Sequence, residues 1–479
     1  MGRRRLAIVM ALVALVVAAW VSPVVGVRAA RSGQTTGDEP HYLLTALSLA
    51  EDRSLDVADE RARLAYVDFH ESALPLQERV REDGRALSPH DPLLPALLAG
   101  PMALGGWVAA KLALAVLAGA LAATMVWIAV RRFAVPLGVA VLAVLAFALA
   151  APLAFYGTQV YPELPAALAV ALAVGALTGP LRRSGLVVLA ACVVALPWLS
   201  VKHVPVAAAL LAVALVRLWR RGEQGAAAVL AGGLAAGAAV YLVAHQVLYE
   251  GWTVYASGHH FSGGETTVIG RDPDYFGRSR RLLGLLTDRG FGLAAWQPAF
   301  LLAVPALVAL VRARPRGWAA LAVPLAAGWL NATFVARTMH GWWWPGRQVV
   351  VVLPCAVLAV AWWTARYERA RRWLLAGAVI GVVTMGWLTV EGLLGHRRIV
   401  VDFEQTANPI YRLWRLALPD DRRLPTGTEA LRALWYAAVA LLAVWGWRSL
   451  TPGAEPPAHV PSAPEPDKRE ARACINVPS

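Results

Sequence analysis

The sequence has 479 residues, of which 58% are hydrophobic and only 16% are charged, and its formal net charge is +14. Soluble globular domains carry about a quarter charged residues. Here, uninterrupted apolar stretches of about 20 residues recur, each long enough to cross a hydrocarbon core of about 30 Å, which argues against a soluble protein. The positive charge lies in short clusters beside these stretches, as in the cytoplasmic loops of membrane proteins, and this placement argues against nucleic acid as a partner. We therefore predict an all-α polytopic membrane protein.

Twelve apolar spans are predicted along the chain. They cover residues 6–27, 106–130, 135–156, 160–178, 185–198, 203–219, 225–249, 291–311, 317–336, 347–365, 372–394 and 431–448. The first span follows three arginines and is longer than the apolar region of a typical secretory signal, so we interpret it as a retained helix.

Arginine clusters between the spans predict the orientation. The clusters are Arg131 and Arg132; Arg182 and Arg183; Arg217, Arg220 and Arg221; Arg312, Arg314 and Arg316; and Arg366, Arg369, Arg371 and Arg372. With the N-terminus inside the cell, every cluster falls on the cytoplasmic side, as the positive-inside rule requires. The long loops at 28–105, 250–290 and 395–430 then face outward. Residues 1–450 form the predicted transmembrane domain, and the proline-rich residues 451–479 form a disordered cytoplasmic tail.

The first outer loop repeats one local pattern. "GDEPHYLLTALSLA" at 37–50 and "SPHDPLLPALLAGP" at 88–101 each place an acid before a proline and a leucine-rich stretch. This order is typical of a helix N-cap followed by a first-turn proline, and both stretches are short enough to lie along the membrane surface. These interfacial helices would bring five polar residues together: Asp38, Glu39, His41, His90 and Asp91. One cap needs only one acid, so the pair Asp38 and Glu39 predicts a further role. For Asp91, capping alone is an equally good explanation.

Two further outer turns carry charge. "YGTQVYPELP" at 156–165 puts Glu163 at the start of a span, either as a cap or as a functional acid. "LPWLSVKHVP" at 196–205 puts Lys202 and His203 between two short apolar segments. A lysine below the membrane surface needs an anionic partner, unless it extends to the headgroups.

Three tryptophans precede the tenth span. In "RTMHGWWWPGRQ" at 337–348, His340, Trp343 and Arg347 lie close together in sequence. Such tryptophans form either an aromatic belt at the membrane interface or a wall that stacks on a sugar while the arginine binds a phosphate. The sequence leaves both interpretations open.

Taken in order, these motifs resemble the GT-C glycosyltransferases, and most of all the branch of the protein O-mannosyltransferases and the lipid A aminoarabinose transferase. The resemblance covers about residues 1–365 and depends on "GDEPHYL", "HDPLLPALLAGP", "YPELP", "PWLSVKH" and "WWWPGR". It implies a sugar donor on polyprenyl phosphate, an extracytoplasmic acceptor and inversion at the sugar. The essential acid would be Asp38 or Glu39, with Asp38 preferred, and the later acid Glu163. A large soluble C-terminal domain is not evident, so the acceptor stays undefined.

The residues also suit this chemistry by themselves. Lys202, His203 and Arg347 would stabilise a leaving lipid phosphate, and Asp38 would act as general base toward an acceptor hydroxyl. His41, His90, Asp91, His340 and Trp343 complete the predicted substrate-binding set. A divalent ion (magnesium, manganese or zinc) is an open alternative for the crowded acids, with Asp38, Glu163 and His90 as candidate ligands.

Two rival functions fit part of the pattern. A transporter or flippase of lipid-linked sugars or of anions would use the basic residues to bind the moving anion and the acids to couple protons. Carriers, however, place such residues near mid-membrane. A non-catalytic assembly subunit would need the apolar spans but not the repeated acid–proline pattern.

Overall fold

The structure is a computed structural model, and it describes residues 2–77, 79–255 and 272–450. The predicted tail at 451–479 lies outside the described residues. The first half contains α1 (Arg3–Val21), η1 (Ser22–Val24), α2 (Glu39–Glu51), α3 (Ala58–Ala62), η2 (Ala65–Asp68), β1 (Arg79–Val80), β2 (Ala86–Leu87), α4 (Leu93–Arg132), α5 (Leu137–Ala148), α6 (Leu153–Tyr156), α7 (Glu163–Thr178), α8 (Arg183–Leu199), η3 (Val201–His203), α9 (Val204–Trp219) and α10 (Gln224–Tyr249).

The second half is also helical. It contains α11 (Tyr275–Ser279), α12 (Arg281–Thr287), α13 (Leu293–Trp296), η4 (Pro298–Leu302), α14 (Ala303–Ala313), α15 (Ala319–Leu330), η5 (Asn331–Val335), η6 (Arg347–Val352), α16 (Leu353–Arg366), α17 (Arg369–Leu393), η7 (Phe403–Gln405), α18 (Pro409–Trp414), η8 (Arg415–Ala417) and α19 (Thr428–Arg448). The prediction of helices throughout misses one small feature, the antiparallel pair β1–β2 in the first outer loop.

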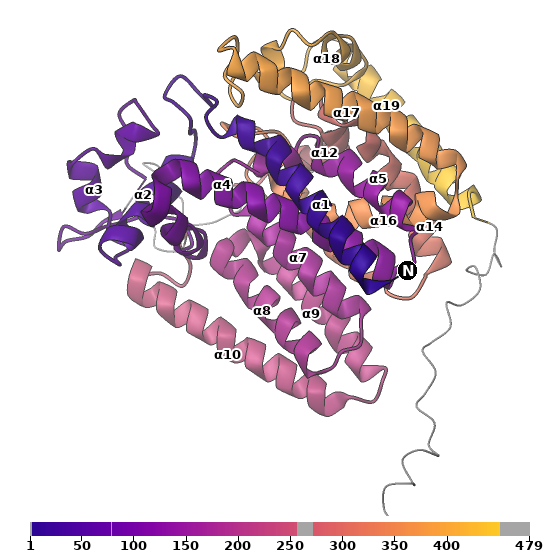
Figure 1. The fold of residues 1–479 in the computed structure, drawn as a ribbon, viewed down its shortest axis with the longest axis horizontal. Coiled ribbons are helices and arrows are strands. Elements are labelled where there is room, and N and C mark those ends of the chain that lie inside the picture. Colours follow the sequence, from indigo (N-terminus) through magenta and orange to yellow (C-terminus); the bar gives the residue numbers. More distant parts are fainter. Residues whose placement is uncertain (1, 78, 256–271, 451–479) are drawn as a thin grey trace, which may run out of the picture.

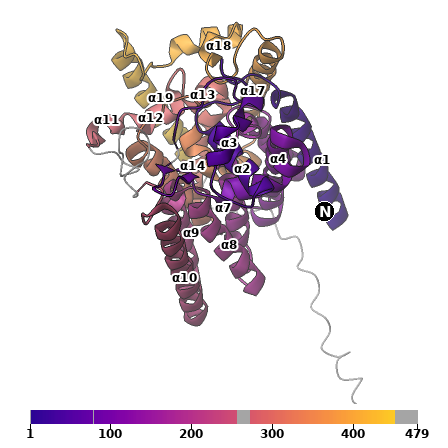
Figure 2. The ribbon, with the colours of Figure 1, turned by 90° about the vertical axis from the view of Figure 1, so that its left-hand side faces the viewer.

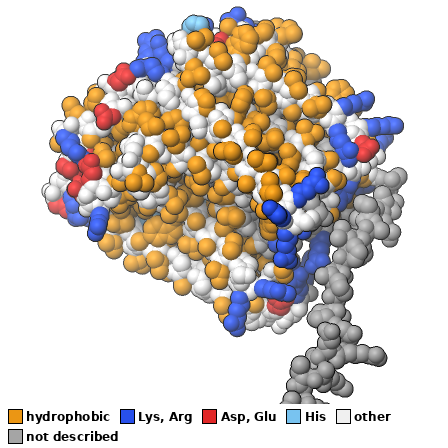
Figure 3. All heavy atoms as spheres, viewed as in Figure 1, with side chains coloured by type: hydrophobic (Ala, Val, Ile, Leu, Met, Phe, Trp, Pro, Cys, Tyr) orange, Lys and Arg blue, Asp and Glu red, His pale blue; other side chains and the backbone are white. Residues whose placement is uncertain are grey.

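The long helices match the predicted spans in position. Seven helical stretches of the described chain are long and apolar enough to cross a membrane, and five apolar helices are shorter, at 10–17 residues. Each of the twelve predicted ranges coincides with one of them, although helix length alone does not establish twelve crossings. Hydrophobic side chains cover most of the face drawn in Figure 3, and lysines and arginines gather toward its margins. These features are those of a multi-pass membrane protein.

One helix combines a predicted interfacial segment with a span. α4 runs from Leu93 to Arg132, but its backbone leaves the helical region at Gly105 and Gly106, where the chain kinks. Gly106 has a φ of 62°, a conformation that glycine adopts without strain. The segment before the kink follows the acid–proline motif, and the segment after it coincides with the predicted span at 106–130.

The stretch from η6 to α16 forms the centre of the molecule. In the span from Arg347 to Arg366, 89% of the most apolar window is buried, and Figure 1 shows α16 surrounded by other helices. α1 packs along α4, where a Cβ atom added to Gly119 would lie only 2.4 Å from the Ala14 carbonyl oxygen. The small residue therefore permits close helix contact, as is common in membrane proteins. α8, α9 and α10 lie together on one side of the molecule (Figure 2), where α8 packs against α7 and α9 packs against α15.

Arginines from several clusters meet at one end of the helices. Arg132 Nε donates to the Gly175 carbonyl at 3.2 Å, and Arg217 Nη2 donates to the Gly179 carbonyl at 2.6 Å. Arg366 Nη2 donates to the Phe133 carbonyl at 3.3 Å. This common end is the one that the sequence predicts to be cytoplasmic.

The predicted orientation can be tested by labelling single cysteines in intact cells with a membrane-impermeant reagent. We expect cysteines placed beside Asp38 and Arg347 to react from outside, because the arginine clusters occupy the other end. Cysteines beside Arg131, Arg182 and Arg221 should react only after permeabilisation. The outward prediction extends to His260, which lies outside the described residues. Two arginine clusters that label from opposite sides would contradict this topology.

Candidate active site

Arg347 joins two of the predicted motifs. Its side chain leaves the first residue of η6, directly after Gly346, whose φ is 85°. Nη2 donates to Asp38 Oδ2 at 2.9 Å, and Nε donates to Glu163 Oε1 at 2.9 Å. Arg347 is only 6% exposed. One buried guanidinium therefore brings together acids from the first outer loop and from the start of α7.

Lys202 adds a third motif to this cluster. Its ammonium group forms an ion pair with Glu163 Oε1, the same oxygen that Arg347 contacts. The other carboxylate oxygen of Glu163 is buried and has no hydrogen-bond partner among the described residues. The lysine therefore has the anionic partner that its position requires. Below, the term charged cluster means the four residues Asp38, Glu163, Lys202 and Arg347.

Helix capping does not account for the acids. Asp38 is the N-cap residue of α2, but its side chain makes no capping hydrogen bond. The N-cap residues of α4 and α7 are Pro92 and Pro162, and neither helix has a side-chain cap. The capping alternative is therefore wrong for Asp38, Asp91 and Glu163.

Asp38 is the most accessible acid of the charged cluster. Its side chain is 21% exposed, against 1% for Glu163. Arg347 holds Oδ2, whereas Oδ1 makes no hydrogen bond with a described residue. Burial would raise the pKa of the Asp38 carboxyl, but attraction to Arg347 and His90 outweighs burial and lowers this pKa well below its usual range. Asp38 is thus ionised at neutral pH, with one oxygen open.

Glu39 points away from the charged cluster although it follows Asp38 directly. Its Oε2 accepts the Val160 N–H at 2.9 Å, and Lys111 Nζ lies 3.9 Å from the same oxygen. Oε1 accepts the Thr36 N–H at 3.4 Å. Complete burial raises the pKa of the Glu39 carboxyl, although Lys111 opposes the rise. Glu39 ties the first outer loop to the turn before α7, which positions Asp38 beside Arg347.

Asp91 binds the separate helix α10. Its Oδ1 accepts the Tyr241 hydroxyl at 2.8 Å and lies 3.0 Å from His245 Nε2. Its Oδ2 accepts the Val201 N–H at 3.0 Å, at the start of the turn that carries Lys202. The structure thus places Asp91 beneath the Lys202 turn, as a residue that orients it.

The two predicted histidines of the first loop lie near Asp38. The rings of His41 and His90 are 6.3 Å apart, and His90 stacks on Tyr42 with ring centroids 4.4 Å apart. His90 Nε2 is 3.3 Å from Gln77 Oε1. Both histidines lie within electrostatic range of Asp38, the acid that contacts Arg347.

The three tryptophans have three different surroundings. Trp342 is 67% exposed, whereas Trp344 is fully buried and stacks on Phe155 with ring centroids 3.7 Å apart. Trp343 is half-buried, and its ring centroid lies 4.7 Å from the Arg347 guanidinium carbon. A single interpretation, either a belt or a sugar-binding wall, therefore does not apply to all three.

Of the two further predicted histidines, His203 is buried and His340 is half-buried. His203 follows Lys202, and its Nε2 has no hydrogen-bond partner in the described part of the chain. His340 packs edge-on against Phe291 at 4.9 Å. Burial, together with nearby Arg422 and Arg281, lowers the pKa of His340 to about 4, so this side chain is neutral at pH 7.

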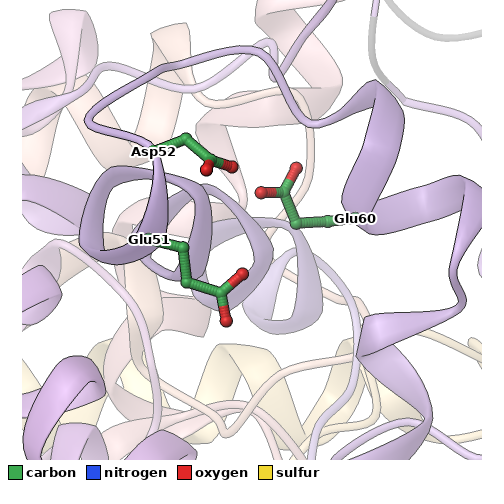
Figure 4. A group of neighbouring side chains, drawn as sticks. All are labelled: Glu51, Asp52 and Glu60. Atoms are coloured by element: carbon green, nitrogen blue, oxygen red, sulfur yellow. The ribbon is translucent and has the colours of Figure 1, made fainter.

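The candidate metal ligands do not form a compact group. Among the described residues, only Glu51, Asp52 and Glu60 bring three potential ligand atoms within 4.8 Å of one another (Figure 4). This group lies between α2 and α3, where Arg63 forms an ion pair with Glu51 and its Nη2 lies 3.8 Å from Glu60 Oε1. Asp38, Glu163 and His90 are not such a group, and Arg347 stands between the two acids.

The buried carboxyl of Glu60 leads us to expect that the folding stability of the protein depends on pH. Its side chain is fully buried, neither oxygen has a hydrogen-bond partner among the described residues, and burial raises its pKa from 4.5 to about 7. The folded state therefore favours the protonated acid, and stability is lost as pH rises from the unfolded pKa through the folded one. We expect Glu60→Gln to raise the unfolding temperature at pH 8 by removing a cost of about 3 kcal/mol.

The control for this prediction is the same comparison at pH 4.5, where wild type and variant should unfold together. An equal difference at both pH values would contradict the titration of Glu60. Exposed Asp83, which pairs with Arg85 in the same loop, offers a matched variant, since Asp83→Asn should leave the melting temperature within about 1 °C of wild type.

The sequence prediction missed three residues that build the site. Lys111 donates to the Gln34 carbonyl at 2.5 Å, and Tyr161 lies under Arg347, with its ring centroid 3.9 Å from the guanidinium carbon. Gly37 has a φ of 59°, and a Cβ atom there would lie 2.6 Å from the Tyr161 hydroxyl. Of the three, Lys111 could have been identified from the sequence, because a single lysine inside an apolar span is costly and needs a partner.

Comparison with known proteins agrees with this architecture. No protein-family model and no curated protein matches the chain. A crystal structure of ArnT from Cupriavidus metallidurans bound to undecaprenyl phosphate is similar, with a TM-score of 0.52 and 16% identity over 93% of this chain and 75% of that chain. The apo structure of the same protein has a TM-score of 0.53 and 16% identity, over 92% of this chain and 77% of that chain. The chain therefore has the fold of ArnT, a lipid A aminoarabinose transferase, and the resemblance to the GT-C glycosyltransferases is confirmed at the level of the fold.

Proposed function

We propose that this protein is a membrane glycosyltransferase that moves a sugar from a polyprenyl-phosphate donor to an extracytoplasmic acceptor with inversion. The acceptor is a glycan, a lipid or a protein. The observation that carries the proposal is the charged cluster, in which Arg347 and Lys202 stand beside a partly open Asp38. The ArnT fold supports it, since one of the ArnT structures holds undecaprenyl phosphate.

Donor binding would rearrange the ion pairs of the charged cluster. Arg347 presents a planar set of donors, which suits bidentate binding of a phosphate, and Lys202 supplies a second positive charge. A donor phosphate would compete with Asp38 for the guanidinium. The release of Asp38 from Arg347 would raise its pKa from the depressed value and make it a stronger base.

The reaction itself is a single displacement. Asp38 accepts the proton of the acceptor hydroxyl, whose oxygen attacks the anomeric carbon of the sugar. The bond between that carbon and the phosphate oxygen breaks, and the electron pair leaves with the polyprenyl phosphate. Arg347 and Lys202 stabilise the added negative charge. The products are the inverted glycoside and polyprenyl phosphate.

Three of the remaining predicted residues would contact the sugar. Trp343 offers a half-buried ring beside Arg347, suited to stacking on a sugar face. His41 and His90 lie on the Asp38 side, where they would bind sugar hydroxyls. A magnesium, manganese or zinc ion held by Asp38, Glu163 and His90 would first require Arg347 to leave the two acids.

A flippase of lipid-linked sugars is the second candidate. It would use the same cations to bind a travelling phosphate. The charged cluster, however, forms where α7, α9 and α16 begin, whereas carriers place such groups near the middle of the membrane.

A reconstituted assay separates the two functions. Purified full-length protein in liposomes is given a panel of radiolabelled polyprenyl-phosphate sugars and a cell-envelope extract as the source of acceptors. We expect the label of one donor to move into a product and free polyprenyl phosphate to accumulate. Movement of the lipid between leaflets without its consumption would indicate a carrier and contradict the transferase.

A further inference from the structure

A pocket lined by arginines lies at the far end of the helices from the candidate active site. It has a volume of about 540 Å³ and opens between the C-terminal half of α9 and the beginning of α15. α7 starts at Glu163 in the charged cluster and ends at Thr178, which lines this pocket. A helix of 16 residues is about 24 Å long. The two sites are therefore separate.

Four arginines line one end of the pocket. They are Arg217, Arg220, Arg221 and Arg316. None of them forms an ion pair within the described ranges, and the neighbouring acid Glu223 is exposed and forms none either. Four cations beside one exposed acid leave this pocket with a net positive charge, which attracts an anion.

The Arg217 side chain carries the clearest sign of a missing partner. Its Nη2 donates to the Gly179 carbonyl at 2.6 Å, but Nη1 is buried and has no hydrogen-bond partner in the described part of the molecule. A buried donor that belongs to a charged group is costly when it is left unpaired. An oxygen anion in the pocket would satisfy this donor.

The rest of the pocket is apolar and arranged along the helix axes. On α9, Val216 and Val213 lie on the membrane side of the arginines, and on α15 Val323 lies beyond Arg316. Val216 is 50% exposed, and Val323 is 37% exposed. The pocket therefore changes from charged to apolar from the ends of the helices toward their middle.

We propose that this pocket binds an anionic phospholipid. The phosphate would lie among the four arginines, and an acyl chain would follow the apolar groove between α9 and α15. Basic pockets between transmembrane helices are suited to acidic lipid headgroups. A free phosphate would share the arginines but leave the groove unused. The proposal is independent of the reaction proposed above.

Native mass spectrometry of the full-length protein with defined lipids tests this proposal. We expect one phosphatidylglycerol to remain bound, with about tenfold preference over phosphatidylcholine. Arg217→Gln and Arg316→Gln should each reduce that retention about tenfold, the effect of losing one charged hydrogen bond. Arg316 donates no hydrogen bond to a described residue, so its variant should fold normally. The matched control is Arg182→Gln, an exposed arginine at the same end that does not line the pocket.

Two further measurements distinguish lipid binding from the binding of a free anion and from a general effect of surface charge. Val216→Trp fills the groove but keeps every arginine, so it should abolish phosphatidylglycerol retention. Millimolar inorganic phosphate should displace the lipid only weakly. Full displacement by phosphate, together with unchanged lipid retention in Val216→Trp, would overturn the lipid site. Equal loss of retention in Arg182→Gln would also overturn it.

Discussion

Asp38→Asn is expected to lower the rate of sugar transfer by about a thousandfold, within the range usual for the loss of a general base. Asparagine has nearly the same shape but cannot accept the acceptor proton. The Michaelis constant for the donor should not rise, because Asp38 competes with the donor phosphate for Arg347. The measurements are kcat and KM in the reconstituted assay, together with donor affinity by direct binding.

The matched control for this change is Asp421→Asn. Asp421 is also a largely buried aspartate that binds an arginine, Arg432 Nη2 at 2.5 Å, but it lies outside the charged cluster. The control should transfer sugar at the wild-type rate. Comparable turnover in Asp38→Asn, at matched expression and melting temperature, would remove Asp38 from the role of base.

Arg347→Lys is expected to weaken donor binding about tenfold or more and to reduce turnover as well. Lysine keeps the positive charge but loses the planar set of donors that contacts Asp38 and Glu163 at 2.9 Å each. A charged hydrogen bond to a phosphate contributes about 1.5–3 kcal/mol, and each 1.4 kcal/mol corresponds to tenfold in affinity. The charge-preserving change is preferred to alanine, because alanine would leave two acids without their partner.

Arg432→Lys provides the control for the arginine. Arg432 is 5% exposed and binds two acids, Asp421 and Glu429, so the control changes the same chemistry in a similar environment. We expect its donor affinity to match wild type even if its melting temperature falls. Lys202→Ala, in the same assay, should also weaken donor binding. Wild-type donor affinity in both Arg347→Lys and Lys202→Ala would locate the phosphate elsewhere.

The structure separates the roles of the two neighbouring acids Asp38 and Glu39. Asp38 and Glu39 are adjacent in the chain, yet one contacts Arg347 and the other contacts Val160 and lies near Lys111. The motif "GDEP" contains both acids and does not distinguish them. The first turn of α2 directs the two side chains to different partners, because consecutive side chains on a helix point about 100° apart.

The positions of the apolar helices, the grouping of the arginines and the motifs of the candidate site could all be predicted from the sequence. These features depend on hydropathy, charge and the order of acids and prolines over about 20 residues or fewer, which are local properties of the chain. The kink that divides α4 at Gly105 and Gly106 also agrees with the predicted start of a span. The GT-C resemblance followed from the order of such motifs.

The pairing of each acid with its cation could not be predicted from the sequence, because it depends on how distant segments pack. Arg347 and Asp38 are 309 residues apart, and Lys202 and Glu163 are 39 apart, so their contacts depend on how α2, α7, η3 and η6 pack. Packing also assigned Asp91 to α10 and turned Glu39 toward Lys111. No local pattern contains this information, because the cost of a buried charge is relieved by whichever opposite charge the fold brings within reach.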